Sequence, residues 1–181
     1  NYAREGLMVD LGDVWGDASA DIGENISSVC QLDGTYYMYP LSAAAHCMAI
    51  NYEVFEAAGA LQYIDEETRT WTTDDFVKAC EALRDAGYSV PGIVYCGGTG
   101  GDQGTRALVR NLYSADFTDA EHTKYTMNSE NGIKGLQLLI DMVNDKSMTY
   151  DAGIVASDEL TLFANGTSCT VSYTHLTLPT K

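Results

Sequence analysis

The stretch from residue 33 to residue 59 constrains the fold of this chain more than any other. Asp33-Gly34 is typical of a tight turn, and the aromatic-rich residues 35–39 after it predict a buried strand. Pro40 has no backbone N–H to donate to a strand ladder, so the strand must end or bend there. A second, small and apolar strand follows, and Asn51 is a favourable N-cap for a helix. Strands and helices therefore alternate, which favours an α/β fold.

The same alternation continues downstream. Thr72 and Asp75 form a capping-box pair at the start of a helix over residues 73–86, and Gly87 is a plausible C-cap. A strand is predicted over residues 92–96. Three more helices follow in the pattern, and we expect them over residues 105–113, 129–144 and 157–164.

Apolar residues at helical or strand spacing predict the core. In the helix over residues 129–144, this spacing is held by Ile133, Leu136, Ile140 and Val143. The predicted core comprises Phe55, Phe76, Leu83, Ile93, Leu136, Ile140 and Phe163. On that basis, Leu136→Ala should cost about 2 to 5 kcal/mol of stability.

Composition and charge exclude several classes of partner. The formal net charge of −16 argues against binding nucleic acid or an anionic membrane face. No stretch approaches the roughly 20 consecutive apolar residues of a membrane span. The five cysteines show no CxxC or Cys/His ligand spacing, so we expect no metal site and no cofactor.

One segment allows close backbone approach to a ligand: the glycine-rich segment of residues 97–104, between a predicted strand and a predicted helix. No Gly-Lys-Ser/Thr follows, so it is not a P-loop, and Gln103 stands where the third Gly of a dinucleotide fingerprint would be. Ligands bind at such strand-to-helix connections in α/β folds. Thr99, Asp102 and Gln103 could donate to and accept from hydroxyl groups. The alternative is a flexible loop with no ligand.

No catalytic constellation accompanies this segment. His46 and His122 lack a Ser or Cys nucleophile in a recognisable context, and no GxSxG, HExxH or paired-carboxylate motif occurs. We interpret both histidines as core or surface residues. Trp15 and Tyr39 could stack on a sugar ring, but Trp15 lies beside apolar neighbours, so packing is an equal interpretation.

Several segments, in order and spacing, resemble the bacterial extracellular solute-binding proteins of ABC importers, in the branch that includes maltose-binding protein. Ile50 departs mildly from the family, which often has Tyr there. The matching segments are residues 2–11, Asp33-Gly34, Tyr39-Pro40, Ile50-Asn51, residues 55–59, residues 71–76, residues 128–136 and residues 163–166.

The resemblance implies a two-lobed, periplasmic-binding-protein-like α/β fold, of which this chain is an internal fragment. It would hold the end of lobe one, one hinge crossover and much of lobe two. The predicted parts are residues 1–42 in lobe one, residues 43–50 as the crossover and residues 51–169 in lobe two.

The resemblance also implies a function: a binding protein, not an enzyme, that holds a carbohydrate, expected to be an oligosaccharide, between the lobes and delivers it to a membrane permease. The implied protein is an extracytoplasmic monomer, either periplasmic or a membrane-tethered lipoprotein. The implied ligand-binding residues are Ser42, Ala43, Thr99, Asp102 and Gln103. A carbohydrate-active enzyme or a ligand-sensing domain on a similar α/β frame is the alternative.

The C-terminal residues differ in their amino-acid pattern from the rest of the chain. Residues 171–180 resemble the translation of a transposase-type sequencing adapter, so we predict that residues 170–181 are not native to the protein. They should pack poorly, although their Val, Tyr and Thr favour a strand. The alternative is a genuine Thr-rich terminal strand.

Overall fold

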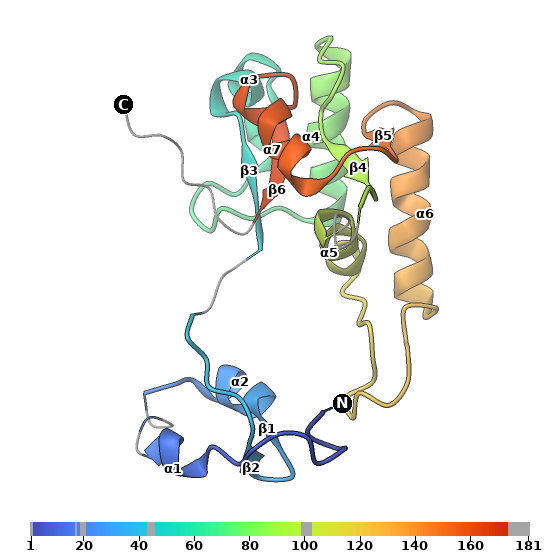
Figure 1. Cartoon of the computed structure of the whole chain (residues 1–181). Coiled ribbons are helices and arrows are strands. Elements are labelled where there is room, and N and C mark those ends of the chain that lie inside the picture. The colour runs from blue at the N-terminus through green and yellow to red at the C-terminus, as the bar shows by residue number, and fades with distance from the viewer. Residues whose placement is uncertain (1, 17, 19–20, 43–45, 99–102, 174–181) are drawn as a thin grey trace. The chain divides into compact units, whose positions relative to one another are not determined.

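The computed structural model describes residues 2–16, 18, 21–42, 46–98 and 103–173 of the 181-residue chain (Figure 1). Helices and strands alternate along it, which confirms the predicted α/β class. The chain divides into two compact units, Asn1–Ala45 and His46–Lys181.

The first unit is organised around one buried tryptophan. Trp15 is 2% exposed, its Nε1 donates to the carbonyl of Met38 at 2.9 Å, and its ring stacks on Tyr36 with centroids 4.1 Å apart. Packing, not an open stacking platform, is therefore the role of Trp15. The elements of this unit are α1 (Gly12–Trp15), α2 (Glu24–Ser27), η2 (Ser28–Cys30), β1 (Gln31–Leu32) and β2 (Thr35–Tyr36).

The turn predicted at Asp33-Gly34 is confirmed. Both residues have positive φ, 51° and 81°, and they join β1 to β2 as an antiparallel hairpin in which Leu32 pairs with Thr35. Two positive φ values in a two-residue loop match the twist of the flanking strands. The buried strand predicted over residues 35–39 is shorter and only half-buried in the structure: β2 ends at Tyr36, and both of its residues have intermediate exposure.

The second unit holds most of the regular structure. Its strands form two pairs: β3 with β6, antiparallel, and β4 with β5, parallel (Figure 1). The elements are β3 (Cys47–Ile50), α3 (Tyr52–Ala57), η3 (Ala60–Tyr63), α4 (Thr73–Asp85), β4 (Ile93–Tyr95), α5 (Gln103–Leu112), α6 (Glu130–Asn144), β5 (Thr149–Asp151), α7 (Ala156–Ala164) and β6 (Thr170–Tyr173).

Side-chain caps fix three of these helices. The side chains of Asn51, Thr72 and Ser129 accept hydrogen bonds from the backbone N–H groups of Val54, Asp75 and Gly132 at the starts of α3, α4 and α6. Each bond satisfies a donor that the helix itself leaves open. The sequence therefore located these starts correctly.

Two apolar clusters form the core of the second unit, and α4 contributes to both. Phe76 and Cys80 pack with residues of β4, α5 and α6, whereas Ala79 and Leu83 pack with Phe55 of α3. The predicted burial of Phe55, Phe76, Leu83 and Ile93 is confirmed, with exposed fractions between 0% and 8%.

The predicted inner face of α6 is wrong. Ile133, Leu136 and Ile140 are 59%, 54% and 46% exposed, and the buried residues of the helix are Gly132, Gly135, Leu139 and Met142. Two glycines on one side let α6 approach neighbouring backbone: a Cβ on Gly135 would collide with the carbonyl oxygen of Val109 on α5. Close approach, not side-chain size, decides which side faces inward. Phe163, also predicted as core, is only half-buried.

Residues 170–173 form a regular strand, as their propensity predicted. Cys47 to Ile50 of β3 pair with Tyr173 to Thr170 of β6, and the hydroxyl of Thr170 donates to the carbonyl of Pro91 at 3.1 Å. Val171 is 0% exposed, so the prediction that this segment packs poorly is wrong at that position. Residues 174–181 lie outside the described part of the chain.

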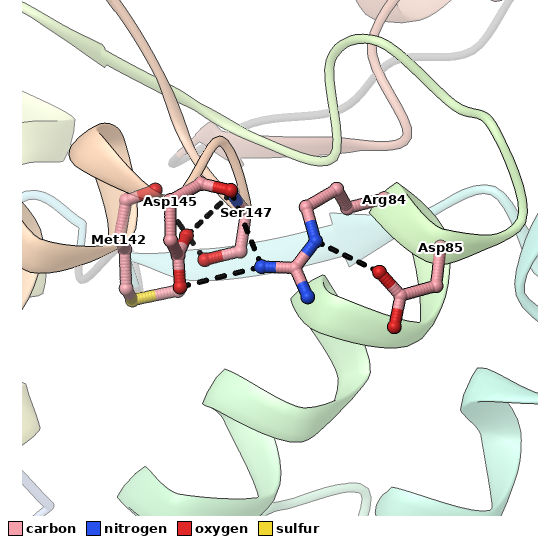
Figure 2. Close-up of polar contacts among 5 residues, drawn as sticks. All are labelled: Arg84, Asp85, Met142, Asp145 and Ser147. Carbon is pink, nitrogen blue, oxygen red and sulfur yellow. Dashed lines mark hydrogen bonds and ion pairs between the residues drawn. The ribbon is translucent and has the colours of Figure 1, made fainter.

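A polar link joins the C-terminal ends of α4 and α6 (Figure 2). The guanidinium of Arg84 lies 3.3 Å from Oδ2 of Asp145 and donates to the Asp145 carbonyl at 3.2 Å, while its Nε pairs with Asp85 at 2.9 Å. The backbone N–H of Ser147 donates to Oδ1 of Asp145 at 2.8 Å. The chain leaving α6 is thereby fixed against the end of α4.

Candidate ligand-binding site

The predicted site residues lie mostly at positions for which the structure gives no geometry. Ala43, Thr99 and Asp102 fall outside the described residues. Ser42 is described and is exposed, and Gln103 begins α5, although its side chain lies outside the described part. Their convergence on one ligand stays a prediction. What the structure does describe is the frame on either side of residues 99–102.

The N-terminal end of the glycine-rich segment rests on the turn before α7. The backbone N–H of Gly97 donates to the carbonyl of Ile154 at 2.9 Å, and a Cβ on Gly97 would lie 2.6 Å from that oxygen. Gly98 has φ +68°, and a Cβ there would lie 3.0 Å from Cγ1 of Val155. Only glycine fits this path, because both the space and the left-handed backbone exclude larger residues.

The C-terminal end of the segment is held by Tyr95, the last residue of β4. The hydroxyl of Thr105 donates to the Tyr95 carbonyl at 2.7 Å and accepts from the Tyr95 N–H at 2.9 Å. A Cβ on Gly104 would lie 2.5 Å from the Tyr95 hydroxyl oxygen. The first turn of α5 therefore sits directly on the end of the strand, in the strand-to-helix arrangement that the sequence predicted.

A buried acid beneath this end was missed by the sequence reasoning. Glu159 on α7 is 2% exposed, and its Oε1 accepts from the backbone N–H of Ser172 at 3.0 Å. Burial raises the pKa of this carboxyl to about 7, against the lowering effect of the Ser172 N–H and the Tyr95 side chain. One signal was available: Glu159, Leu162 and Phe163 share the i, i+3, i+4 spacing of one helix face.

The two histidines considered above, His46 and His122, each lie at hydrogen-bond distance from a hydroxyl group. His46, just before β3, lies with Nε2 2.9 Å from the hydroxyl of Ser172, and His122 lies with Nδ1 2.8 Å from the hydroxyl of Thr118. Among the described residues, no group of three His, Cys, Asp or Glu side chains is arranged to hold a metal ion.

A groove of about 570 Å³ runs beside β3 and was also not predicted. Apolar Met48, Ile50 and Trp71 and the charged residues Glu66 and Arg69 are among its lining residues. The lining residues come from β3, the first turn of α3, η3 and the connection to α4. No sequence motif unites them, so periodicity and spacing gave no sign of the groove.

Residues 1–166 match the family described as bacterial extracellular solute-binding protein. This chain belongs to that family. No helix in the described ranges of the chain is long and apolar enough to cross a bilayer. No curated protein matches the sequence.

Solved structures resemble this family member in fold at low sequence identity. The GacH receptor of Streptomyces glaucescens GLA.O, described unliganded and with acarbose, is 16% identical with a TM-score of 0.71, covering 95% of this chain and 42% of that one. The cyclic alpha-maltosyl-1,6-maltose binding protein from Arthrobacter globiformis is 21% identical with a TM-score of 0.68, covering 92% and 41%.

A third similar structure is described with a ligand that is not a saccharide. UgpB from Mycobacterium tuberculosis, in complex with glycerophosphocholine, is 15% identical with a TM-score of 0.70, covering 95% of this chain and 43% of that one. The chain spans less than half the length of each of these three structures. The family member therefore has the two-lobed periplasmic-binding-protein-like fold class, and this likeness leaves its ligand open.

Proposed function

We propose that this chain is part of the substrate-binding component of an ABC importer, which holds a carbohydrate, an oligosaccharide in our proposal, in an interlobe cleft. It delivers the ligand to a membrane permease and catalyses no reaction. The protein acts outside the cytoplasm as a monomer, either periplasmic or tethered to the membrane as a lipoprotein.

The observation that carries this proposal is the anchored glycine-rich segment at the carboxyl end of β4. The Gly97 N–H bonds to the Ile154 carbonyl at one end, and the Thr105 hydroxyl bonds to the backbone of Tyr95 at the other, so a ligand would meet a segment whose two ends are fixed. Ligands of α/β folds bind at this edge of the sheet. A segment that is fixed at both ends also loses less conformational entropy on binding than a free one.

Neutral sugars suit the residue types of the proposed site. Thr99, Asp102 and Gln103 follow the fixed glycines and carry both donors and acceptors, and Ser42 adds an exposed hydroxyl. Each neutral hydrogen bond to a sugar hydroxyl contributes on the order of 0.5–1.5 kcal/mol net. Several such bonds, made together, are needed for useful affinity.

Calorimetric titration tests the proposal. Protein from the complete reading frame is titrated with maltotriose, cyclic maltosyl-maltose and a chitooligosaccharide, beside a hydrolysis assay on the same sugars. Binding without hydrolysis is expected, and Asp102→Ala with Gln103→Ala should weaken it. Hydrolysis would favour the enzyme alternative, and unchanged affinity in the double variant would remove the glycine-rich segment from the site.

Glycerophosphocholine belongs in the same panel as a second candidate ligand. The reason is the fold likeness to UgpB, together with the place of the segment directly before the N-terminus of α5, because helix N-termini favour anions. Binding of this ligand and of no saccharide would overturn the carbohydrate proposal while leaving the importer proposal standing.

A further inference from the structure

The connection between α7 and β6 begins with an asparagine followed by glycine. Asn165 comes directly after α7, and Gly166 follows it with φ +78°. The Gly166 N–H donates to the carbonyl of Phe163 at 3.0 Å, and the Thr167 N–H donates to that of Leu162 at 2.8 Å. These two bonds form a Schellman motif, in which the left-handed residue after the helix is usually glycine. The end of the helix therefore explains why glycine follows Asn165.

This glycine has a chemical consequence for Asn165. Asparagine is one of the heat-labile residues of proteins, and its side-chain amide is most easily attacked by the backbone when glycine follows, because no side chain stands in the way. A Cβ on Gly166 would meet no atom within 4 Å, so the space around it is open. Asn165, Gly166 and Thr167 are all exposed. Water can therefore reach the asparagine side chain and the peptide group that follows it.

The side-chain carbonyl of Asn165 is held by two donors from one residue. Its Oδ1 accepts from the hydroxyl of Thr167 at 2.6 Å and from the backbone N–H of Thr167 at 3.1 Å. Both donors withdraw electron density from the carbonyl, which makes its carbon a better electrophile. When a nucleophile adds to that carbon, negative charge develops on Oδ1, and donors that are already in place stabilise it. The turn thus has the arrangement of a small oxyanion hole.

The other Asn-Gly pair of the chain lies in a different setting. Asn131 and Gly132 belong to the first turn of α6, where the Gly132 N–H donates to the side chain of the N-cap Ser129. Gly132 is buried, and a Cβ there would collide with the carbonyl oxygen of Met127. The peptide group of this pair cannot turn toward the asparagine side chain without breaking the helix and its packing. We therefore expect this pair to be protected.

We propose that Asn165 is a site of spontaneous deamidation, promoted by Thr167. The helix end opens, as helix termini fray, and frees the Gly166 nitrogen. This nitrogen gives its proton to solvent and bonds to Cγ of Asn165, while charge collects on Oδ1. The Cγ–Nδ2 bond then breaks, and the amide takes a proton from water and leaves as ammonia, which closes a cyclic imide. Water adds to either ring carbonyl and breaks its bond to nitrogen, giving aspartate or isoaspartate.

Both products disturb the connection between α7 and β6. Each places a negative charge at the C-terminal end of α7, where the helix dipole disfavours it. Isoaspartate also lengthens the backbone by a methylene group, whereas the N–H groups of Thr167 and Ser168 both reach the Leu162 carbonyl in the present spacing. Ser168 is 1% exposed, so the added length cannot be taken up without moving a buried residue. Modified protein should therefore unfold at lower urea concentration.

Peptide mapping tests the proposal on wild-type protein. Protein from the complete reading frame is kept at 37 °C at pH 6 and at pH 8.5, and mass spectrometry follows the conversion of amide to acid at Asn131 and Asn165. Enzymatic methylation measures the isoaspartate formed. Modification is expected at Asn165 and not at Asn131, and faster at pH 8.5, because the attacking nitrogen must lose its proton. In concentrated urea both should react. Equal rates at the two positions in folded protein would overturn the proposal.

Two variants test the part played by Thr167. Thr167→Val removes the hydroxyl and keeps the backbone N–H, so it should slow the modification of folded protein by roughly tenfold, less than the loss of an oxyanion donor costs an enzyme because solvent replaces part of it. Thr167→Ser keeps the hydroxyl and is the matched control, with the wild-type rate expected. In concentrated urea all three proteins should react alike.

Equal rates in folded Thr167→Val and wild type would overturn the role of Thr167, and so would a difference between them that persists in urea. If Thr167→Val does not fold, the contrast between Asn165 and Asn131 in folded wild type still decides whether residue 165 is the modification site. None of these outcomes depends on saccharide binding, so the inference and the proposed function can fail separately.

Discussion

Helices α4 and α6 have similar lengths and similar N-caps, yet the apolar pattern predicted the buried side of α4 correctly and that of α6 wrongly. In α4, Phe76, Cys80 and Leu83 are buried as their spacing predicts. In α6, the corresponding stripe of Ile133, Leu136 and Ile140 faces outward. The difference is that α4 is apolar on one side, whereas α6 is apolar on two. A helix of the second kind belongs between two layers of structure.

The outward side of α6 borders a second groove, of about 330 Å³, between this helix and the β4–β5 pair. Leu136, Ile140 and Val143 line it from the helix, and Val94 and Tyr150 line it from the strands. Parallel strands are usually covered on both faces. The described chain covers one side of α6 well and leaves the other open to solvent.

The largest expected effects come from the inner faces of both helices. Leu83→Ala on α4 and Leu139→Ala on α6 should each lower the free energy of unfolding by about 2–5 kcal/mol, because each removes a fully buried side chain and leaves a cavity. Urea titrations monitored by circular dichroism measure the free energy of unfolding of both variants. A cost below 1 kcal/mol at Leu139 would show that α6 is not packed through this side.

The next effect comes from the glycine side of α6. Gly135→Ala should cost about 1–3 kcal/mol, although alanine is the better helix former, because the added methyl meets the backbone oxygen of Val109 and pushes α5 and α6 apart. The matched control is Gln137→Ala, which lies on the exposed side of the same helix. A stabilised Gly135→Ala variant would contradict the close helix contact.

The helix caps and Gly135 show which features of the fold could be predicted from the sequence and which could not. Caps at Asn51, Thr72 and Ser129 were found because their side chains bond within their own turn, a local event. The inner side of α6 was not predicted, because Gly135 packs against the backbone of α5, a contact between two helices that the pattern of one helix does not reveal. For the site, the glycine-rich segment was recognised, but the buried Glu159 was not, because its hydrogen bond comes from Ser172 on β6, which local sequence patterns do not pair with it.

A smaller effect is expected on the outward side of α6, which revises the value that periodicity suggested. Leu136 is 54% exposed, so Leu136→Ala should cost about 1 kcal/mol or less in this chain, roughly half of what full burial of leucine provides. The same urea titration, run beside Leu139→Ala, gives the contrast directly. Equal costs at the two positions would erase the distinction between the sides of α6.

The smallest effect concerns the link between the two helices at Arg84 and Asp145. Partial burial raises the pKa of Asp145, but hydrogen bonds from Ser147 and the guanidinium of Arg84 outweigh it and hold the pKa below its ordinary value of 3.8. A lowered folded-state pKa means that the carboxylate stabilises the fold above the unfolded-state value. This contribution is lost as the pH falls below 3.8 toward the folded-state value.

Arg84→Met keeps the apolar stem of the side chain and removes the charge, so it should lower the free energy of unfolding only slightly at pH 7, as expected for a partly exposed ion pair. The variant should also lose less stability than wild type on acidification below 3.8, since Asp145 then keeps only its Ser147 bonds. Arg110→Met, which breaks the more exposed pair with Asp116, is the control. Because that pair does not join α4 to α6, an equal loss in both variants would mean that the Arg84 contact adds nothing to holding the two helices together.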